Sequence, residues 1–271
     1  MKPEQICPLV ASLPKGAPFE AKAPRHGMLK IDFHLHSSED PHDALDYDAR
    51  ELIRHAAGLH FDAIAITLHG RVIDDAGLQQ FARDEGVLFI PGIEKRIHGK
   101  EVLIYNVTQA EMDAIHTFAD LREMKSRKGS KILIIAPHPF FKQSQCLGRH
   151  LEENIDLFDA IEYCHLYPRF WNLNKRAAEV AHAHGKPMVA TSDAHALWMF
   201  GRNYTLLDAP KTMAGIFQAV REGGGQPHSE PIKLMQFVKK MGWFLAVHKF
   251  RKLMRSARRL DSRESPHSVH G

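Results

Sequence analysis

Short apolar runs alternate with amphipathic segments along most of this chain of 271 residues. Apolar runs bounded by turn residues indicate strands, and apolar residues spaced three and four positions apart indicate helices. The pattern predicts strands over residues 28–34, 61–67, 87–90, 101–107, 131–136, 160–163, 188–191 and 204–207. It predicts helices over residues 49–57, 76–84, 111–128, 172–184 and 213–221.

The ends of several predicted helices carry the residues that such ends prefer. Asp48 is placed to accept hydrogen bonds from the free N–H groups that begin the first helix, and Gly58 is placed to end it. Strands that alternate with helices form parallel sheets, because each crossover helix returns the chain to the same edge. The sequence therefore predicts an α/β fold, either a barrel or an open sheet.

The first predicted strand ends in two histidines, His34 and His36, separated by Leu35. Successive side chains of a strand point to opposite faces, so both imidazoles lie on one face and Leu35 on the other. Two imidazoles on one rigid face can hold a metal ion. Because the chain has 19 histidines, a chance pair is the alternative.

Ligand-type residues also follow four other apolar runs. They are His69, Glu94, His138 and the pair Asp193 and His195. In α/β barrels the active site lies at the carboxyl ends of the strands, where all these residues fall. Five strand ends of this kind predict one shared metal site at that end of a barrel.

Composition narrows the class of protein. Apolar residues make up 44% of the chain, enough for a sizeable core, and no run of 18 apolar residues predicts a membrane span. The three cysteines, Cys7, Cys146 and Cys164, have no CxxC spacing and predict no disulfide framework. Residues 1–27 lack the apolar core of a signal peptide, so we expect a cytoplasmic protein.

In their order along the chain, the strand-end motifs resemble those of the polymerase and histidinol phosphatase (PHP) domain family. The resemblance covers about residues 30–207. It implies a distorted barrel of seven β/α units, two or three divalent metal ions, usually zinc, manganese or iron, and hydrolysis of phosphate esters. The motifs are D-F-H-L-H-S at 32–37, I-T-L-H-G at 66–70, P-G-I-E at 91–94, A-P-H-P at 136–139 and S-D-A-H at 192–195.

At three positions the sequence departs from the family pattern or does not fix the ligand. Leu68 stands where the second motif usually has an aspartate, which puts support for the following histidine in doubt. Spacing does not fix the acidic ligand after the first motif; we favour Asp43 over Asp40 or His42, and a solvated loop residue is the alternative. Glu101 falls where the family often has a histidine. A carboxylate there can still bind a hard or borderline ion, although a surface strand residue is the alternative.

The ligand set predicts the chemistry. Dications held close together lower the pKa of a water that bridges them and clamp the oxygens of a phosphoryl group. His138 or His195 could instead act as the general acid, although we expect both to be ligands. The metal ligands implied are His34, His36, Asp43, His69, Glu94, Glu101, His138, Asp193 and His195. We expect His34, His36, Glu94, His138, Asp193 and His195 to act in catalysis.

The sequence leaves the substrate open among small phosphorylated metabolites, nucleotides and oligonucleotides. Phosphate groups also need cations outside the metal shell, and several basic residues follow the motifs. We expect Lys142 and Arg202 to bind substrate, with a solvated surface charge as the alternative for each. Cys164 is expected to be a small buried residue rather than a nucleophile.

Three segments are expected: an N-terminal extension over residues 1–27, a PHP-like hydrolase domain over 28–222 and a basic helical tail over 223–271. Three consecutive glycines mark the second boundary. The tail combines apolar residues at helical spacing with many Lys and Arg residues. Such a helix could contact an anionic membrane surface, a nucleic acid or a partner, or pack on the barrel with a solvated basic face. About the last ten residues are expected to be disordered.

Two functions from different classes fit this sequence. The first is a metal-dependent phosphoesterase, either a phosphatase or a nuclease. The second is a non-catalytic PHP-like module for metal binding or protein interaction, which Leu68 favours slightly. The first is favoured more strongly by the retained ligand-type residues, which are His34, His36, His69, Glu94, His138, Asp193 and His195. A TatD-like or amidohydrolase barrel shares the H-x-H strand, but such barrels typically end in a lone aspartate rather than in a pair like Asp193 and His195.

Overall fold

The computed structural model describes residues 27–164, 167 and 172–232. The described residues up to Pro231 belong to one compact unit, and Ile232 is separate from it. The expected N-terminal extension and most of the expected basic tail lie outside the described residues. Every helix in the described part of the chain is too short or too polar to cross a membrane.

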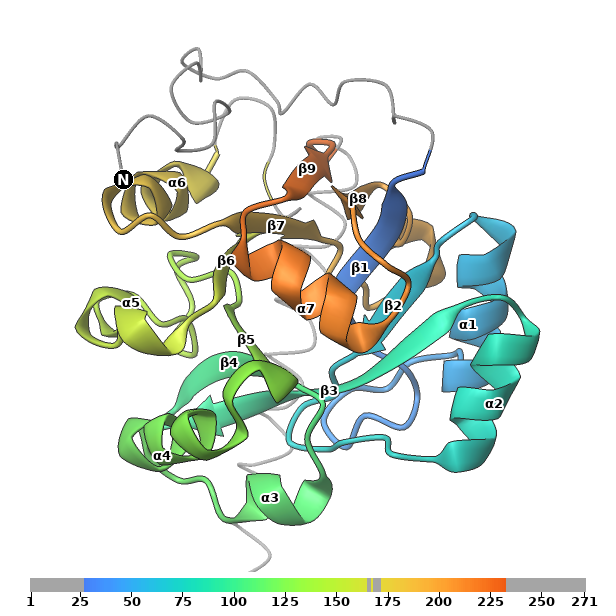
Figure 1. Ribbon diagram of the computed structural model, residues 1–271, viewed down its shortest axis with the longest axis horizontal. Helices are drawn as coiled ribbons and strands as arrows, with labels where there is room; N and C mark the ends of the chain where they lie inside the picture. Colours follow the sequence, from blue (N-terminus) through green and yellow to red (C-terminus); the bar gives the residue numbers. More distant parts are fainter. Residues whose placement is uncertain (1–26, 165–166, 168–171, 233–271) are drawn as a thin grey trace, which may run out of the picture. The chain divides into compact units, whose positions relative to one another are not determined.

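Nine strands form one curved sheet in the order β7-β6-β5-β4-β3-β2-β1-β8-β9 (Figure 1). Strands β1 to β3 are parallel to one another, and so are β5 to β7, while β4 runs antiparallel between the two groups. The strands are β1 (Leu29–Leu35), β2 (Ala63–Ile66), β3 (Leu88–Ile97), β4 (Lys100–Tyr105), β5 (Leu133–Ala136), β6 (Ala160–Cys164), β7 (Met188–Thr191), β8 (Asn203–Leu207) and β9 (Gly225–Ser229).

The sheet nearly closes on itself, because β7 lies against β8 and β9. At this seam the hydroxyl oxygen of Thr205 accepts a hydrogen bond from the Ala190 N–H (2.9 Å) and donates to the Ala190 carbonyl (3.0 Å). A bridge between Leu35, at the end of β1, and Ala194, just beyond β7, adds a further link. The fold is therefore a distorted α/β barrel, which confirms the sequence prediction.

Seven α-helices lie among the described residues, and their capping explains where they begin. Asp48 forms a capping box with Glu51 at the start of the first helix, as predicted. The segment predicted as one helix over 111–128 is instead two helices, because Thr117 and Asp120 form a new capping box. The helices are α1 (Ala49–Gly58), α2 (Ala76–Asp84), α3 (Gln109–Asp113), α4 (Phe118–Lys128), α5 (His150–Glu153), α6 (Asn174–Ala183) and α7 (Met213–Arg221).

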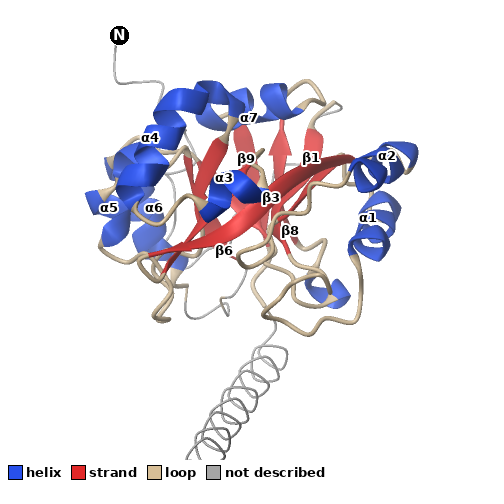
Figure 2. Ribbon diagram, turned by 90° about the horizontal axis from the view of Figure 1, so that it is seen from below, coloured by secondary structure: helices blue, strands red, loops and turns tan. Residues whose placement is uncertain are grey.

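Apolar side chains fill both faces of the sheet. Outside the barrel, α1 and α2 pack over β2 and its neighbours, and α3, α4 and α6 pack over β4 to β6. Figure 2 shows the strands in the middle, with α1 and α2 on one side and α4, α5 and α6 on the other. Inside, Ile216 and Phe217 of α7 pack with strand residues such as Ile31 and Leu133. These residues lie near the amino ends of the parallel strands, which leaves the carboxyl ends to the polar residues.

Strand β3 runs well past its predicted end at Ile90. Pro91 pairs with Ile66, the last residue of β2, so its missing N–H falls where the parallel ladder ends. The next residue approaches its neighbours so closely that only glycine fits: a Cβ on Gly92 would lie 2.9 Å from side-chain atoms of Thr67 and Tyr105. The strand then continues as one arm of a hairpin with β4, and this rigid arm carries the ligand-type residue at position 94.

Strand β9 lies beyond the domain boundary expected at residue 223. It pairs antiparallel with β8, from Gly225 opposite Leu207 to Ser229 opposite Asn203. The barrel sheet therefore extends past the three glycines. The sequence of β9, Gly-Gln-Pro-His-Ser, contains no β-branched residue and gave no strand signal.

Candidate metal centre

His34 and His36 are fully buried at the end of β1. Leu35, between them, packs outside in the cluster beneath α1 and α2, as strand alternation predicts. Phe33, in contrast, packs in the barrel interior. The register between β1 and β2 shifts between Asp32 and Leu35, which marks a bulge. Bulges redirect side chains, and this one changes the alternation so that both histidines face the interior.

The ring nitrogens of these two histidines meet two carboxylates. His34 Nε2 and His36 Nε2 lie 3.2 Å apart. Asp193 Oδ1 lies 3.5 Å from each of them. Glu94 Oε2 lies 3.5 Å from His34 Nε2 and 3.6 Å from His36 Nε2. Donors from the ends of β1 and β7 and from the middle of β3 therefore converge on one point of the interior.

These spacings fit a bound metal ion. Ligand atoms bonded to one ion at about 2.1 Å lie roughly 3 to 3.5 Å apart. Two imidazole nitrogens 3.2 Å apart can share one proton at most, whereas a cation between them satisfies both lone pairs. Imidazole nitrogen together with carboxylate oxygen suits zinc, manganese and iron.

The charges in the centre also favour cations. Burial alone would lower the pKa of His34, but Asp193, Glu94 and Glu162 raise it well above its usual value. Burial would raise the pKa values of Glu94 and Asp193, yet the imidazoles around them hold both well below the usual range. Burial would likewise lower the pKa of His69, but hydrogen-bonded carboxylates raise it to about 11. The carboxylates thus create a site for positive charge, supplied by protons or by metal ions.

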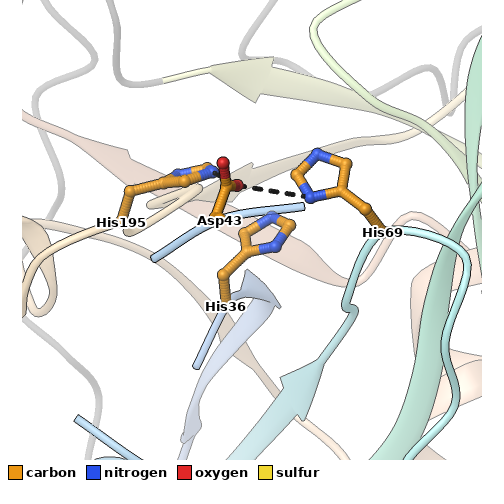
Figure 3. A group of neighbouring side chains, drawn as sticks. All are labelled: His36, Asp43, His69 and His195. Carbon is orange, nitrogen blue, oxygen red and sulfur yellow. Dashed lines mark ion pairs between the residues drawn. The ribbon is translucent and has the colours of Figure 1, made fainter. Parts of the chain in front are cut away.

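A second, nitrogen-rich donor group consists of His36, Asp43, His69 and His195. Figure 3 shows the carboxylate of Asp43 between the rings of His195 and His69. Asp43 Oδ2 lies 3.1 Å from His195 Nε2 and 3.4 Å from His69 Nδ1. His195 Nδ1 donates to the Asp193 carbonyl (3.0 Å), which turns Nε2 toward Asp43 and the other donors of the group.

Asp40 lies behind this group and orients two of its rings. Its Oδ2 accepts hydrogen bonds from His36 Nδ1 (3.1 Å), His69 Nδ1 (2.9 Å) and the His69 backbone N–H (2.8 Å). Leu68, where the family usually has aspartate, is buried in the apolar cluster beneath α1 and α2. The carboxylate support for His69 therefore comes from Asp40, which spacing alone could not separate from Asp43.

Glu94 connects this group to a third one. Its Oε2 lies 3.1 Å from His69 Nε2, and its Oε1 lies 3.2 Å from His138 Nε2. Glu101 is buried beside it, with Oε2 4.0 Å from His138 Nε2. Arg96, directly opposite Glu101 in the hairpin, donates from Nε and Nη2 to Glu101 Oε1 (3.0 and 2.8 Å). One oxygen of Glu101 is therefore engaged by Arg96, and the other faces the centre.

Glu162 is a buried carboxylate of this cluster that the sequence analysis missed. It lies in the middle of β6, and its side chain is fully buried. Oε1 lies 2.9 Å from His34 Nδ1 and also accepts the Thr191 hydroxyl. Oε2 accepts the backbone N–H of His138. An acidic residue inside an otherwise apolar strand was the available signal, because a buried carboxylate requires partners.

Two site residues have strained backbones. His138, with φ +26°, and Asp193, with φ +45°, both lie in the left-handed region that residues other than glycine rarely adopt. Such conformations persist where the surrounding structure holds them, and they cluster at functional sites. Around His138 this support includes Cys146, whose sulfur lies 3.5 Å from His138 Nδ1. Cys164 is buried in the same small apolar cluster as Cys146, as expected for a packing residue.

The two basic residues expected at the substrate lie on loops beyond the metal ligands. Lys142 is exposed, four residues after His138. Arg202 is half-buried and immediately precedes β8. Because β8 runs antiparallel to β1, its first residues lie at the end of the barrel where β1 delivers His34. Position thus agrees with a substrate role for Arg202, and the role itself stays a prediction for both residues.

Comparison with known families identified one matching segment. The family model described as PHP-associated matches residues 171–224. This segment includes Asp193 and His195, the last two predicted ligands along the chain. A search of curated proteins found no match to this sequence.

The fold is similar to those of several solved structures. A two-domain protein of Bacteroides vulgatus, described as containing a predicted PHP-like metal-dependent phosphoesterase, aligns with a TM-score of 0.55 and 17% identity over 79% of this chain and 68% of that one. PsfC from Pseudomonas syringae aligns with a TM-score of 0.54 and 16% identity, over 80% of this chain and 98% of PsfC. A lesion-specific endonuclease of Pyrococcus furiosus aligns with a TM-score of 0.54 and 14% identity, over 74% of this chain and 57% of the endonuclease. The likeness shows a distorted (β/α)7 barrel of the PHP type, as predicted.

Proposed function

We propose that the PHP-family domain, identified by the matched segment together with the shared fold, is a metal-dependent hydrolase of phosphate esters. The observation that carries the proposal is the position of Glu94. Its Oε2 faces His34, His36 and His69, while its Oε1 faces His138. A single buried carboxylate thus lies between four imidazoles from three different motifs, as a carboxylate shared between metal ions requires.

We infer two or three divalent ions, of zinc, manganese or iron, held by three groups of donors. His34, His36 and Asp193 with Glu94 would hold one. When bound, such ions act as Lewis acids toward the phosphoryl group and lower the pKa of water. The nitrogen-rich group would hold a second ion through Asp43, His69 and His195, because the remaining ring nitrogen of His36 can bind only one ion. We take Glu94, Glu101 and His138 as the third group, since His138 Nε2 lies 3.2 Å from Glu94 Oε1 and 4.0 Å from Glu101 Oε2.

The other residues of the centre fix the ligands and handle protons. Asp40 and Glu162 accept ring N–H groups, which sets the tautomer of each imidazole and directs its second nitrogen inward. His138 and His195 are the candidates for protonating the leaving group if one of them is not a ligand. The side chain of His195 is 20% exposed and that of His138 is 10% exposed, so His195 is the easier one for a substrate to reach.

Basic side chains on the loops around the metal centre would bind the substrate phosphate. We propose Lys142 and Arg202 for this role, since both follow ligand positions and Arg202 lies at the ligand end of the barrel. The substrate classes that fit are small phosphorylated metabolites, nucleotides and oligonucleotides. Endonuclease Q, which shares the fold, has been solved with a 27-mer duplex substrate that has an abasic lesion at its active site. DNA therefore belongs among the substrates to test.

Removal and return of metal tests the proposal. The purified protein would be treated with a chelator, supplied separately with zinc, manganese or iron, and assayed on p-nitrophenyl phosphate, bis(p-nitrophenyl) phosphate, AMP and abasic DNA. We expect hydrolysis of at least one ester to disappear with the metal and to return with it. Stoichiometric metal binding without hydrolysis of any of these esters would instead support the non-catalytic metal-binding module.

A further inference from the structure

Trp198 is the exposed large apolar side chain among the described residues, with 51% of its surface accessible. It lies in a short 3-10 turn, Leu197–Met199, between β7 and β8. Its neighbours Leu197, Met199 and Phe200 pack in the apolar cluster beneath α1 and α2. The indole is therefore exposed on a turn whose adjacent side chains are anchored in the core.

The segment that carries Trp198 is fixed at both ends. At its start, Ala194 is buried, bridges to Leu35 and accepts a hydrogen bond from the Tyr47 hydroxyl (3.0 Å). At its end, Gly201 has φ +90° and packs so closely that a Cβ there would lie 2.8 Å from Leu59. A segment held in this way presents its side chains without a large ordering cost on binding.

The segment also ties the backbone of Trp198 closely to the predicted ligand His195. Trp198 follows His195 by three residues, so their Cα atoms lie within about 11 Å of each other. Arg202 follows Trp198 by four residues, within about 14 Å. Chain length thus keeps Trp198 and Arg202 within reach of the end of the barrel at which Asp193 and His195 lie.

We propose that Trp198 is a stacking platform for the base of a nucleotide whose phosphate lies at the metal centre. The inference rests on the proposed function and selects its substrate class: a nucleotide or an oligonucleotide end, rather than a phosphorylated sugar without a base. An indole stacks on any base, because every base has a π-face. Single exposed apolar residues are common on protein surfaces and need no ligand. This one lies on a segment anchored at Ala194 and Gly201, three residues after the predicted ligand His195.

Ligand binding to metal-loaded protein, measured by tryptophan fluorescence, tests the proposal without relying on turnover. The chain has three tryptophans, so replacing Trp171 and Trp243 with Phe leaves Trp198 as the reporter. The probes are phosphonate analogues of AMP and of ribose 5-phosphate, in which carbon replaces the ester oxygen. We expect the AMP analogue to quench Trp198 fluorescence in a saturable manner, and to bind more tightly than the ribose analogue.

Calorimetry on variants of the otherwise unchanged chain gives the decisive comparison. Trp198→Ala should weaken binding of the AMP analogue roughly 5- to 150-fold, the worth of one base stack, and leave the ribose analogue unchanged. Trp198→Phe should retain most of the affinity. Equal weakening of both analogues, an unchanged affinity for the AMP analogue, or binding of neither analogue by the wild type would overturn the proposal. Nucleotide binding through Trp198 without hydrolysis would support this inference while contradicting the proposed function.

Discussion

His34 Nδ1 lies 2.9 Å from Glu162 Oε1, and both side chains are fully buried. This contact gives the ring proton of His34 to Nδ1 and leaves Nε2 free to face His36, Glu94 and Asp193. Carboxylates that hold metal-binding histidines in this way fix the tautomer and raise ligand basicity. We therefore expect Glu162 to act on a bound metal through His34.

Changing Glu162 to Gln should weaken metal binding by roughly 10- to 100-fold. Its Oε1 can be replaced by the amide oxygen, but the amide N–H₂ would then meet the backbone N–H of His138, and two donors would face each other. Competition with a chelating dye would measure the affinity. The matched control is Glu179→Gln, because Glu179 is half exposed on α6 and should leave affinity unchanged. Identical metal affinities in the two variants would mean that Glu162 does not support metal binding.

Replacing Glu101 with His should shift metal preference from manganese toward zinc, on the order of tenfold in relative affinity. Imidazole nitrogen suits zinc, whereas carboxylate oxygen suits manganese. The replacement also frees Arg96, so Arg96→Gln serves as the control for loss of that ion pair. Paired titrations of metal-free protein with the two ions would measure the ratio. A ratio unaffected by Glu101→His would mean that Glu101 is no ligand.

The seam strand β9 should make stability depend on pH through His228. Its ring stacks on Tyr204 (centroids 4.5 Å apart), and burial lowers the pKa of His228, with Glu230 opposing and Lys30 adding to the shift. The folded state binds a proton on His228 less readily than the unfolded chain does. The stability that the neutral His228 ring contributes is therefore complete above the ordinary histidine pKa of about 6.5. It is lost as pH falls from that value toward the lower, folded pKa.

His228→Phe keeps an aromatic ring on Tyr204 and removes the titrating group. The free energy of unfolding, measured by urea denaturation at pH 7 and pH 5, should fall less between these values in the variant than in the wild type. His182→Phe, at an exposed position on α6, provides the comparison. If the two variants lose the same stability on acidification, burial of His228 does not contribute to the pH dependence.

The sequence predicted the barrel because its strongest signals are local. Apolar runs, alternation at His34 and His36, and the Asp48 cap all follow from neighbouring residues, and the structure confirms them. Strand β9 depends on pairing with β8 rather than on its own residues, so its segment carried no signal. The chain breaks between α3 and α4 because a capping box at Thr117 begins a new helix, which apolar periodicity does not reveal.

In the candidate site, too, local sequence predicted some features, whereas others depend on contacts between distant segments. Strand-end positions identified the residues that the structure brings together, from His34 to His195. The supporting residues were not identified, because their role depends on contacts between distant segments. Glu162 lies 128 residues from His34, and Asp40 was indistinguishable by spacing from Asp43 until the loop was folded against His69.

We propose that this cluster performs metal-dependent hydrolysis of a phosphate ester, and the variant Asp193→Asn offers the sharpest test. The change removes one charge while nearly preserving shape, at an oxygen 3.5 Å from both His34 Nε2 and His36 Nε2. The measurement is the rate of phosphoester hydrolysis by wild type and variant at matched metal content. The rate should fall at least ~100-fold in the variant, the upper range for losing a ligand or its support. Equal rates would place the activity elsewhere and rule out hydrolysis at this cluster.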